Sequence, residues 1–107
     1  MAYEIILAPS AVKELGALRA DIRGRVRDAI ELHLRHEPTK VSKSRIKRLR
    51  GLDQPQYRMR VDEVMVFYDV QESAVQVLAI VTKGQAEAWL KAQGTPSKTG
   101  GTGEGKG

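Results

Sequence analysis

Three apolar segments in the second half of the chain most constrain its fold. Residues 57–61 alternate apolar and cationic side chains with a period of two, which is typical of a half-buried β-strand. Residues 64–68 and 75–81 are almost continuously apolar, as strands covered on both faces are. Only short polar breaks separate the three segments, and short breaks join antiparallel neighbours. A mainly antiparallel sheet is therefore predicted.

The register of the first hairpin follows from the length of its turn. If residues 62–63 form a two-residue turn, Arg60 lies opposite Met65. Directly opposed residues share a face of the sheet, with Cβ atoms about 5 Å apart. Arg58, two positions before Arg60, lies on that face too. The sequence thus predicts a sheet face with two arginines beside Met65.

The first half of the chain predicts a strand followed by two helices. Residues 3–7 form a short apolar run, and residues 9–10 resemble a helix start. Within residues 22–34, apolar side chains recur at i, i+4, i+7, i+8 and i+12, which indicates an amphipathic helix. Proline should end this helix near residues 37–38. We expect the two helices to join around residues 20–21.

A last short helix over residues 86–93 completes the order β-αα-βββ-α. This order predicts an α+β fold in which an N-terminal strand and a helical hairpin pack on a mainly antiparallel sheet. We expect one domain over residues 1–93. Residues 94–107 are rich in Gly, Thr and Lys and have nothing to anchor a core, so this tail is predicted to be disordered.

The apolar segments are too short and too interrupted to suggest a membrane protein. Glu4 interrupts the first apolar run, which makes it a poor signal peptide. No apolar stretch approaches the roughly 20 residues of a membrane-spanning helix. We therefore expect a cytoplasmic protein with no membrane partner.

The formal charge of +5 is unevenly distributed. Residues 40–60 contain a single acid, Asp53, and eight cations: Lys40, Lys43, Arg45, Lys47, Arg48, Arg50, Arg58 and Arg60. Such a block is either a solvated face or a surface that binds a polyanion. Composition alone leaves both interpretations open.

The residue types present exclude several kinds of site. The absence of cysteine excludes disulfides, thiol catalysis and zinc–thiolate sites. His33 and His36 have no evident third ligand, so no metal or other cofactor is expected. His33 lies at the edge of an apolar stripe, which favours a packing role. Hydrolase motifs of the usual kinds are absent.

The two strand arginines remain as candidates for chemistry. Guanidinium groups on a sheet can stabilise charge that develops on a phosphodiester. They are poor general bases, because an arginine keeps its proton near neutral pH. The alternative is that Arg58 and Arg60 only solvate the outer face of the sheet.

Three ordered motifs resemble a known family. They are Arg48-Leu49-Arg50-Gly51-Leu52, Tyr57-Arg58-Met59-Arg60-Val61 and Val66-Phe67-Tyr68-Asp69-Val70. Together with Ala8-Pro9-Ser10-Ala11, they are similar in order and spacing to the RelE/ParE toxin superfamily, over about residues 2–92. The resemblance implies the β-αα-βββ-α fold and a toxin of a type II toxin–antitoxin pair. RelE-type members are mRNA interferases, which inhibit translation by cutting mRNA on the ribosome without a metal; ParE-type members poison gyrase.

The resemblance also implies roles for individual residues. Arg58, Arg60 and Lys83 match the cationic catalytic positions of RelE-type enzymes, whereas Met65 stands where such enzymes usually have an arginine. Trp89 falls near a family tyrosine and would stack on a base or pack in the core. Restoring an arginine at position 65 would then be expected to raise cleavage by a stably folded variant.

The resemblance further implies that five loop cations contact the RNA backbone: Lys43, Arg45, Lys47, Arg48 and Arg50. Two functions therefore stay open. One is a ribosome-dependent mRNA endoribonuclease with an incomplete catalytic set, and the other is a non-catalytic binding protein, either a ParE-like gyrase inhibitor or an inactive antitoxin-binding relative. The expected partners are a cognate antitoxin, in a heterotetramer, and the ribosome with its mRNA.

Overall fold

A computed structural model of the chain describes residues 2–97. Its helical elements are α1 (Pro9–Ala17), α2 (Ala20–Ala29), the π-helical segment η1 (Ile30–Leu34) and α3 (Lys83–Gln93). Its strands are β1 (Glu4–Leu7), β2 (Ile46–Arg48), β3 (Leu52–Gln54), β4 (Tyr57–Val61), β5 (Val64–Val70), β6 (Ala74–Thr82) and β7 (Thr95–Pro96). The predicted α+β class and its β-αα-βββ-α core order are confirmed.

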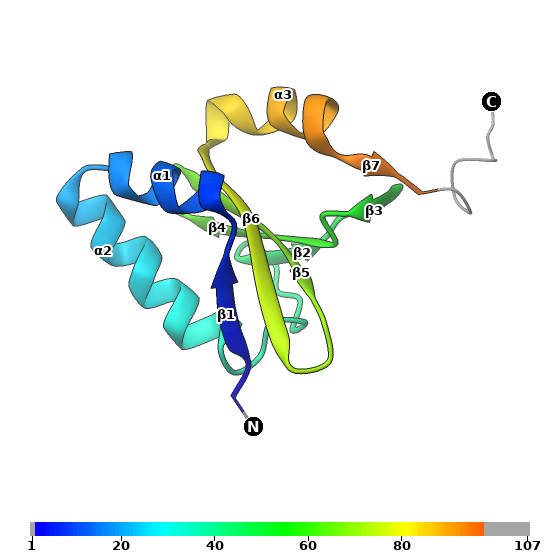
Figure 1. Cartoon of the computed structure of the whole chain (residues 1–107), viewed down its shortest axis with the longest axis horizontal. Helices are drawn as coiled ribbons and strands as arrows, with labels where there is room; N and C mark the ends of the chain where they lie inside the picture. Colours follow the sequence, from blue (N-terminus) through cyan, green and yellow to red (C-terminus); the bar gives the residue numbers. More distant parts are fainter. Residues whose placement is uncertain (1, 98–107) are drawn as a thin grey trace.

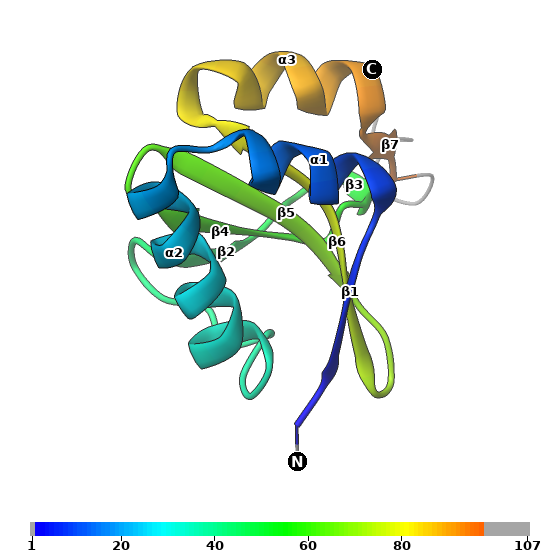
Figure 2. The same ribbon diagram turned by 60° about the vertical axis from the view of Figure 1, so that its left-hand side comes forward.

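Five strands form one sheet in the order β1-β6-β5-β4-β2 (Figure 1). All neighbours are antiparallel except β1, which pairs in parallel with β6 at the edge of the sheet. A parallel neighbour needs a long crossover, and the paired helices with the strands after them supply it. Figure 2 shows the α1–α2 pair and α3 as separate layers around this sheet.

The β4–β5 hairpin has the register that the two-residue turn predicts. Arg60 pairs with Met65, and Arg58 pairs with Phe67. Asp62 adopts a φ of 54°, a left-handed conformation that aspartate tolerates better than most residues. The turn therefore holds the two arginines on one sheet face.

The alternation of side chains along the strands divides the core into two parts. Residues such as Met59, Val66 and Tyr68 point toward α1 and α2, and Val26 and Leu34 are fully buried there. Tyr68 donates a hydrogen bond from its hydroxyl to the carbonyl of Pro38 at 2.6 Å, so its polar atom is satisfied in the core. These contacts make the α1–α2 side the larger core.

The smaller core lies on the opposite face, under α3. Met65, Phe67, Ala79 and Val81 are buried there. Leu49 and the α3 residues Ala86, Trp89 and Leu90 pack against them. No residue of α3 is itself fully buried, so this helix covers the sheet with a half-exposed face.

The helical pair differs in its boundaries from the sequence prediction. The helices join at residues 18–19 rather than 20–21, because Arg19 is extended and Leu18 already leaves the helical conformation. Arg23 donates hydrogen bonds to the carbonyls of Gly16 and Leu18, which satisfies the open end of α1. The second helix changes to π geometry at Ile30 and ends at residue 34, before the proline that was expected to end it.

The segment predicted as a basic loop contains two short strands. β2 pairs with β4, and β3 pairs with β7. Each strand has three residues, which is too short for a period of two to be visible in the sequence. The sheet therefore extends one strand beyond β4.

The predicted disorder from residue 94 is wrong for residues 94–97. Gly94 donates from its N–H to the carbonyl of Leu90 at 2.8 Å, and Thr95–Pro96 then pairs with β3. A Cβ at Gly94 would lie 2.5 Å from the Leu90 oxygen, so glycine permits this close return of the chain. Residues 98–107, which complete the predicted tail, lie outside the described residues.

Candidate nucleic-acid interface

The sheet face under α3 is divided into an apolar half and a cationic half. Across the four antiparallel strands, one row runs from Lys47 on β2 through Arg58 and Phe67 to Ala79 on β6. Paired residues share a face, so the two cations adjoin the apolar pair in this row. Because α3 covers only the β5 and β6 half, Lys47 and Arg58 lie beyond its cover.

The second row has the same division. Arg60 on β4 is exposed, whereas its partners Met65 and Val81 are buried under α3. The Arg60 N–H donates to the carbonyl of Arg45 at 2.8 Å, so the Arg45 backbone lies beside this row, but Arg45 lines a depression together with His33 of the helical layer. Lys47, Arg58 and Arg60 therefore form one group, which we call the cationic face, and Arg45 lies at its margin.

Arg58 is the member of the cationic face with the most unusual environment. Its side chain is partly buried, and its Nη1 atom is inaccessible and has no hydrogen-bond partner among residues 2–97. Burial, and then the nearby charge of Arg60, lowers the pKa of Arg58. A buried donor without a partner is costly for the folded state, and a ligand from solvent cannot contact an inaccessible atom. An anion bound here would therefore contact the accessible part of the Arg58 side chain.

Arg60 is more exposed than Arg58. Its Nε donates to the backbone carbonyl of Asp62 at 3.1 Å, which leaves the terminal nitrogens of the guanidinium available. None of the three residues of the cationic face forms an ion pair within the described part of the chain. Their charges therefore add to one positive potential.

The predicted loop cations do not all contribute to this face. Arg48 points to the opposite face, where its guanidinium lies 5.0 Å from the centroid of the Tyr57 ring. This cation–π contact gives Arg48 a structural role in the sheet. Lys43 and Arg50 are exposed on either side of β2, and neither contacts the strand arginines through a hydrogen bond or ion pair within residues 2–97.

Lys83 lies at the end of the hairpin. Its N–H donates to the carbonyl of Glu63 at 2.7 Å, which fixes the start of α3 beside the β4–β5 turn. Thr82 and Gln85 form a capping box there, so the helix begins at a defined position. The Lys83 side chain is exposed at the same end of the sheet as Arg60.

Trp89 and Met65 both pack in the smaller core under α3. The Trp89 ring stacks on Phe67 with centroids 4.9 Å apart and an interplanar angle of 6°. One face of the indole is therefore occupied, which favours the packing role over base stacking. Met65 lies in the same cluster and is 9% exposed.

Two residues that the sequence did not single out support the hairpin turn. Arg25 on α2 forms an ion pair with Asp62 at 2.9 Å. The hydrogen bond and charge of Asp62 raise the pKa of Arg25. Their separation along the chain leaves no sequence signal for the pair. The contact ties the arginine-bearing hairpin to the helical layer.

A general base or metal ligand set is not evident in this region. Among residues 2–97, no group of three or more His, Asp or Glu side chains could hold a metal ion. His33 lies near Arg45 in a depression of about 380 Å³ that also reaches Arg60. Burial and the charge of Arg45 lower the pKa of His33, while Glu37 opposes the shift.

No helix within residues 2–97 combines the length and the apolar character needed to cross a membrane. The described surface instead offers cations that could contact the phosphates of a nucleic acid. The arrangement can bind and polarise a phosphate, but it supplies no group that readily accepts a proton.

Several solved structures similar to this chain are components of toxin–antitoxin systems. A chain of the RelB–RelE antitoxin–toxin complex from Methanococcus jannaschii has a TM-score of 0.62 and 21% identity, with 78% of this chain and 96% of that chain covered. A chain of the archaeal RelE–RelB complex from Pyrococcus horikoshii has a TM-score of 0.60 and 25% identity, covering 79% and 99%. A mutant of the E. coli toxin RelE in the free state has a TM-score of 0.59 and 19% identity, covering 86% and 95%.

No protein-family model and no curated protein sequence matches the chain. The structural likeness covers almost the full length of each neighbour. The resemblance to the RelE/ParE superfamily that the sequence indicates is thus confirmed at the level of the fold.

Proposed function

We propose that this chain, which has the RelE-like fold, is the toxin of a type II toxin–antitoxin pair and acts on ribosome-bound mRNA. The fold supports the assignment as a toxin, because its structural neighbours are RelE toxins and RelB–RelE complexes. The cationic face supports the proposed action on mRNA. A cognate antitoxin is the partner that this assignment requires.

The single observation that favours RNA as the ligand is the group of adjoining cations on one sheet face, Lys47, Arg58 and Arg60, none of which forms an ion pair within residues 2–97. The accessible part of the Arg58 side chain could bind one phosphate oxygen, and Arg60 and Lys47 could hold the other oxygens or the adjacent phosphate. Single-stranded RNA presents such phosphates in an open, adaptable backbone. Arg45 and Lys83 extend the same positive surface at its margins.

In the proposed reaction the ribose 2′-hydroxyl attacks the adjacent phosphorus. A P–O bond to the 2′-oxygen forms, and the bond to the 5′-oxygen of the next nucleotide breaks. The leaving 5′-oxygen takes a proton from water, and a 2′,3′-cyclic phosphate remains. Arg58 and Arg60 would stabilise the charge on the pentacoordinate phosphate. They would not take the proton from the 2′-hydroxyl, because a guanidinium keeps its own. That proton would pass to water or to the ribosome.

From this set of residues we expect slow cleavage. A charged donor aimed at the reacting group contributes about 10²–10³ in rate at comparable sites. Met65 cannot supply such a donor, and its side chain is packed under α3. The same observation favours a second candidate, in which the cationic face binds its target without cutting it.

Primer extension on mRNA in a reconstituted translation system separates these functions. We expect cuts that depend on ribosomes, and we expect the double variant Arg58→Ala/Arg60→Ala to abolish them. The matched control is Lys13→Ala/Lys91→Ala, which removes two exposed cations from α1 and α3 and should cut as the parent does.

Other outcomes choose between the alternatives. Ribosome binding without cleavage would support the non-catalytic function. If the chain neither binds ribosomes nor cuts mRNA, but inhibits DNA supercoiling by gyrase, the ParE-like alternative is correct and the proposal is wrong.

A further inference from the structure

Unpaired cations continue from the cationic face into a depression beside the helical layer. This depression has a volume of about 380 Å³. Arg60 and Val61 line it from the hairpin, Leu32 and His33 line it from η1, and Arg45 lines it from the loop before β2. Because Arg60 belongs to both surfaces, a strand bound at the cationic face would be adjacent to this depression.

The loop before β2 holds Arg45 by its backbone on both sides. The Arg45 N–H donates to the Ser42 hydroxyl oxygen at 3.0 Å, and the Arg45 carbonyl accepts from the Arg60 N–H at 2.8 Å. The Ile46 N–H donates to the same Ser42 oxygen at 3.1 Å, which closes the loop. The Arg45 guanidinium itself forms no hydrogen bond or ion pair within residues 2–97. Its backbone is therefore fixed while its donors stay available.

The charges that line the depression do not balance. Arg25 is neutralised by Asp62 at 2.9 Å. Arg45, Arg60 and the carboxylate of Asp28 also line the depression, and none of these three forms an ion pair within the described part of the chain. Two guanidinium groups thus stand against one carboxylate. The net charge is positive, and a bound anion would compensate it.

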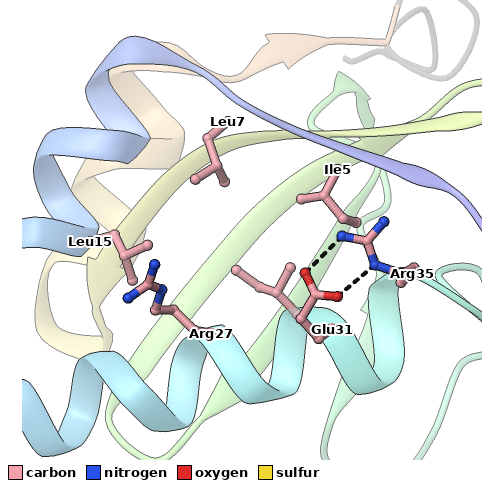
Figure 3. Close-up of a pocket in the computed structure, with 7 residues that line it drawn as sticks. Ile5, Leu7, Leu15, Arg27, Glu31 and Arg35 are labelled. Atoms are coloured by element: carbon pink, nitrogen blue, oxygen red, sulfur yellow. Dashed lines mark hydrogen bonds and ion pairs between the residues drawn. The ribbon is translucent and has the colours of Figure 1, made fainter.

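The groove on the other side of the same helical layer has a different charge pattern (Figure 3). There Arg35 donates two hydrogen bonds to Glu31, at 2.6 and 2.8 Å, so this guanidinium already has its anion. Arg27 is the remaining cation of that groove, and it is exposed. The depression at Arg45 and Arg60 instead has two unpaired guanidinium groups, which is the number that can hold one phosphate from two sides.

The depression also exposes an apolar side chain. Leu32 is 68% exposed, and Ala29 and Val61 beside it are half-buried. A simple anion would leave this apolar wall in water. The ring of a nucleobase would cover it, because apolar side chains can contact the faces of unstacked bases. The lining therefore suits a ligand with both a phosphate and a flat ring.

We propose that this depression holds one nucleotide of single-stranded RNA, next to the nucleotide bound at the cationic face. The inference rests on the proposed function and adds a subsite to it. The phosphate lies between Arg45 and Arg60, and the base covers Leu32. Asp28 accepts a hydrogen bond from the edge of the base. The same carboxylate would repel an acidic peptide, which favours RNA as the occupant.

The two histidines of the chain give an NMR test with an internal control. His33 lines the depression, whereas His36 is exposed outside it. A phosphate bound beside His33 favours the protonated ring, so a short single-stranded RNA should move the midpoint of the His33 ring titration to a pH higher by about 1. The His36 titration should stay in place, and RNA should bind more tightly as the pH falls.

Other charged groups also surround His33, and each histidine signal is read separately from them. They are Arg25, Asp28 and Glu37 from the helical layer, Lys40 and Arg45 from the loop before β2, and Arg60 and Asp62 from the hairpin.

Substitutions at exposed positions separate the phosphate contact from the base contact. Arg45→Ala should weaken binding of a fluorescently labelled RNA by about tenfold. Leu32→Ser should weaken it by about fivefold and leave the binding of inorganic phosphate unchanged, whereas Leu32→Met should bind as the parent does. Arg27→Ala is the matched control, because it removes an exposed cation from the groove in Figure 3. This control should bind RNA as the parent does.

RNA that leaves the His33 signal in place, or that tolerates Arg45→Ala, overturns the inference. Inorganic phosphate that moves His33 as far as RNA does would mean a site for a lone anion, and tighter binding of polyglutamate than of RNA would mean a site for an acidic peptide. Either result also overturns the inference.

Ribosome-dependent cleavage of mRNA reports separately on the proposed function. Cleavage by a chain whose His33 signal does not respond to RNA contradicts only the inference. RNA bound in the depression without cleavage supports the inference and the non-catalytic alternative. A chain that neither cleaves mRNA nor binds RNA contradicts both proposals.

Discussion

Met65 lies directly opposite Arg60 in the β4–β5 ladder, yet its side chain packs under α3 while that of Arg60 is exposed. The margin of α3 therefore passes between two paired residues. On one side of this margin the sheet face is apolar and buried, and on the other side it is cationic. This division decides what each substitution on the face should do.

An arginine at position 65 should destabilise the protein, contrary to the expectation from the sequence. Met65→Arg would place a charge in the cluster with Phe67 and Ala79, and we expect a decrease of about 2–4 kcal/mol in the free energy of unfolding. Met65→Leu preserves volume and should cost less than about 1.5 kcal/mol. Urea denaturation measures both. A Met65→Arg variant as stable as the parent, with faster mRNA cleavage, would support the expectation from the sequence instead.

Arg58 should lower the free energy of unfolding of the protein. Its inaccessible Nη1 lacks a partner among the described residues, so Arg58→Met removes an unsatisfied donor and should raise the free energy of unfolding by roughly 1 kcal/mol. Arg60→Met serves as the matched change at an exposed position and should leave stability unchanged. Both variants should bind RNA more weakly. Lower stability of Arg58→Met would mean that packing by the guanidinium stem outweighs the unmet donor.

The salt dependence of ribosome binding should report how many phosphates the protein neutralises. Replacing Arg58 and Arg60 with alanine should reduce the slope of log affinity against log salt by roughly one unit for each phosphate that is no longer neutralised. Arg19→Ala removes an exposed cation elsewhere and should leave the slope unchanged. The affinities are measured over a series of salt concentrations. An unchanged slope in the double variant would indicate that both arginines only solvate the outer face of the sheet.

His33 should make stability depend on pH. Its pKa in the folded protein is lowered, first by burial and then by Arg45, from an ordinary value of 6.5. The unfolded chain therefore binds the proton more readily, so the free energy of unfolding should fall as pH drops below about 6.5 and should be unaffected by His33 above it. His33→Gln should reduce this slope, and the exposed His36→Gln should retain it. Thermal denaturation between pH 5 and pH 8, roughly the range of histidine titration, measures the effect.

The end of the described chain should contribute to stability. Truncation after Gly94 removes the pairing of Thr95–Pro96 with β3, and we expect it to lower the melting temperature by about 4–8 °C for a destabilisation of roughly 1 kcal/mol. A second truncation, after Ser97, keeps this pairing. The difference between the two truncated chains isolates the contribution of β7. Equal melting temperatures would show that the pairing adds nothing.

The sequence predicts the hairpin well because two local rules agree there. The period of two in residues 57–61 and the two-residue turn at residues 62–63 together determine which residues are opposed. The same rules fail for β2, whose three residues include only one apolar side chain, Ile46. The loop cations therefore could not be assigned to faces, and the opposite orientations of Lys47 and Arg48 are visible only in the structure.

The candidate site depends even more on contacts that are distant in sequence. Trp89 has helical spacing that suggests packing, but its partner Phe67 lies on another element. Whether Met65 was covered or exposed depended on the position of α3, which the periodicity of a short helix does not determine. The sequence showed that this region is rich in cations, but it did not show where the cationic face ends.

The parallel pairing of β1 with β6 has a consequence for how the protein is made. Glu4 pairs with Ala74, so the first strand to be synthesised has no place in the sheet until most of the chain has followed it. α3, which follows β6 and bounds the cationic face, is translated later still. The boundary of the cationic face is therefore set only after every strand of its five-stranded sheet has been synthesised.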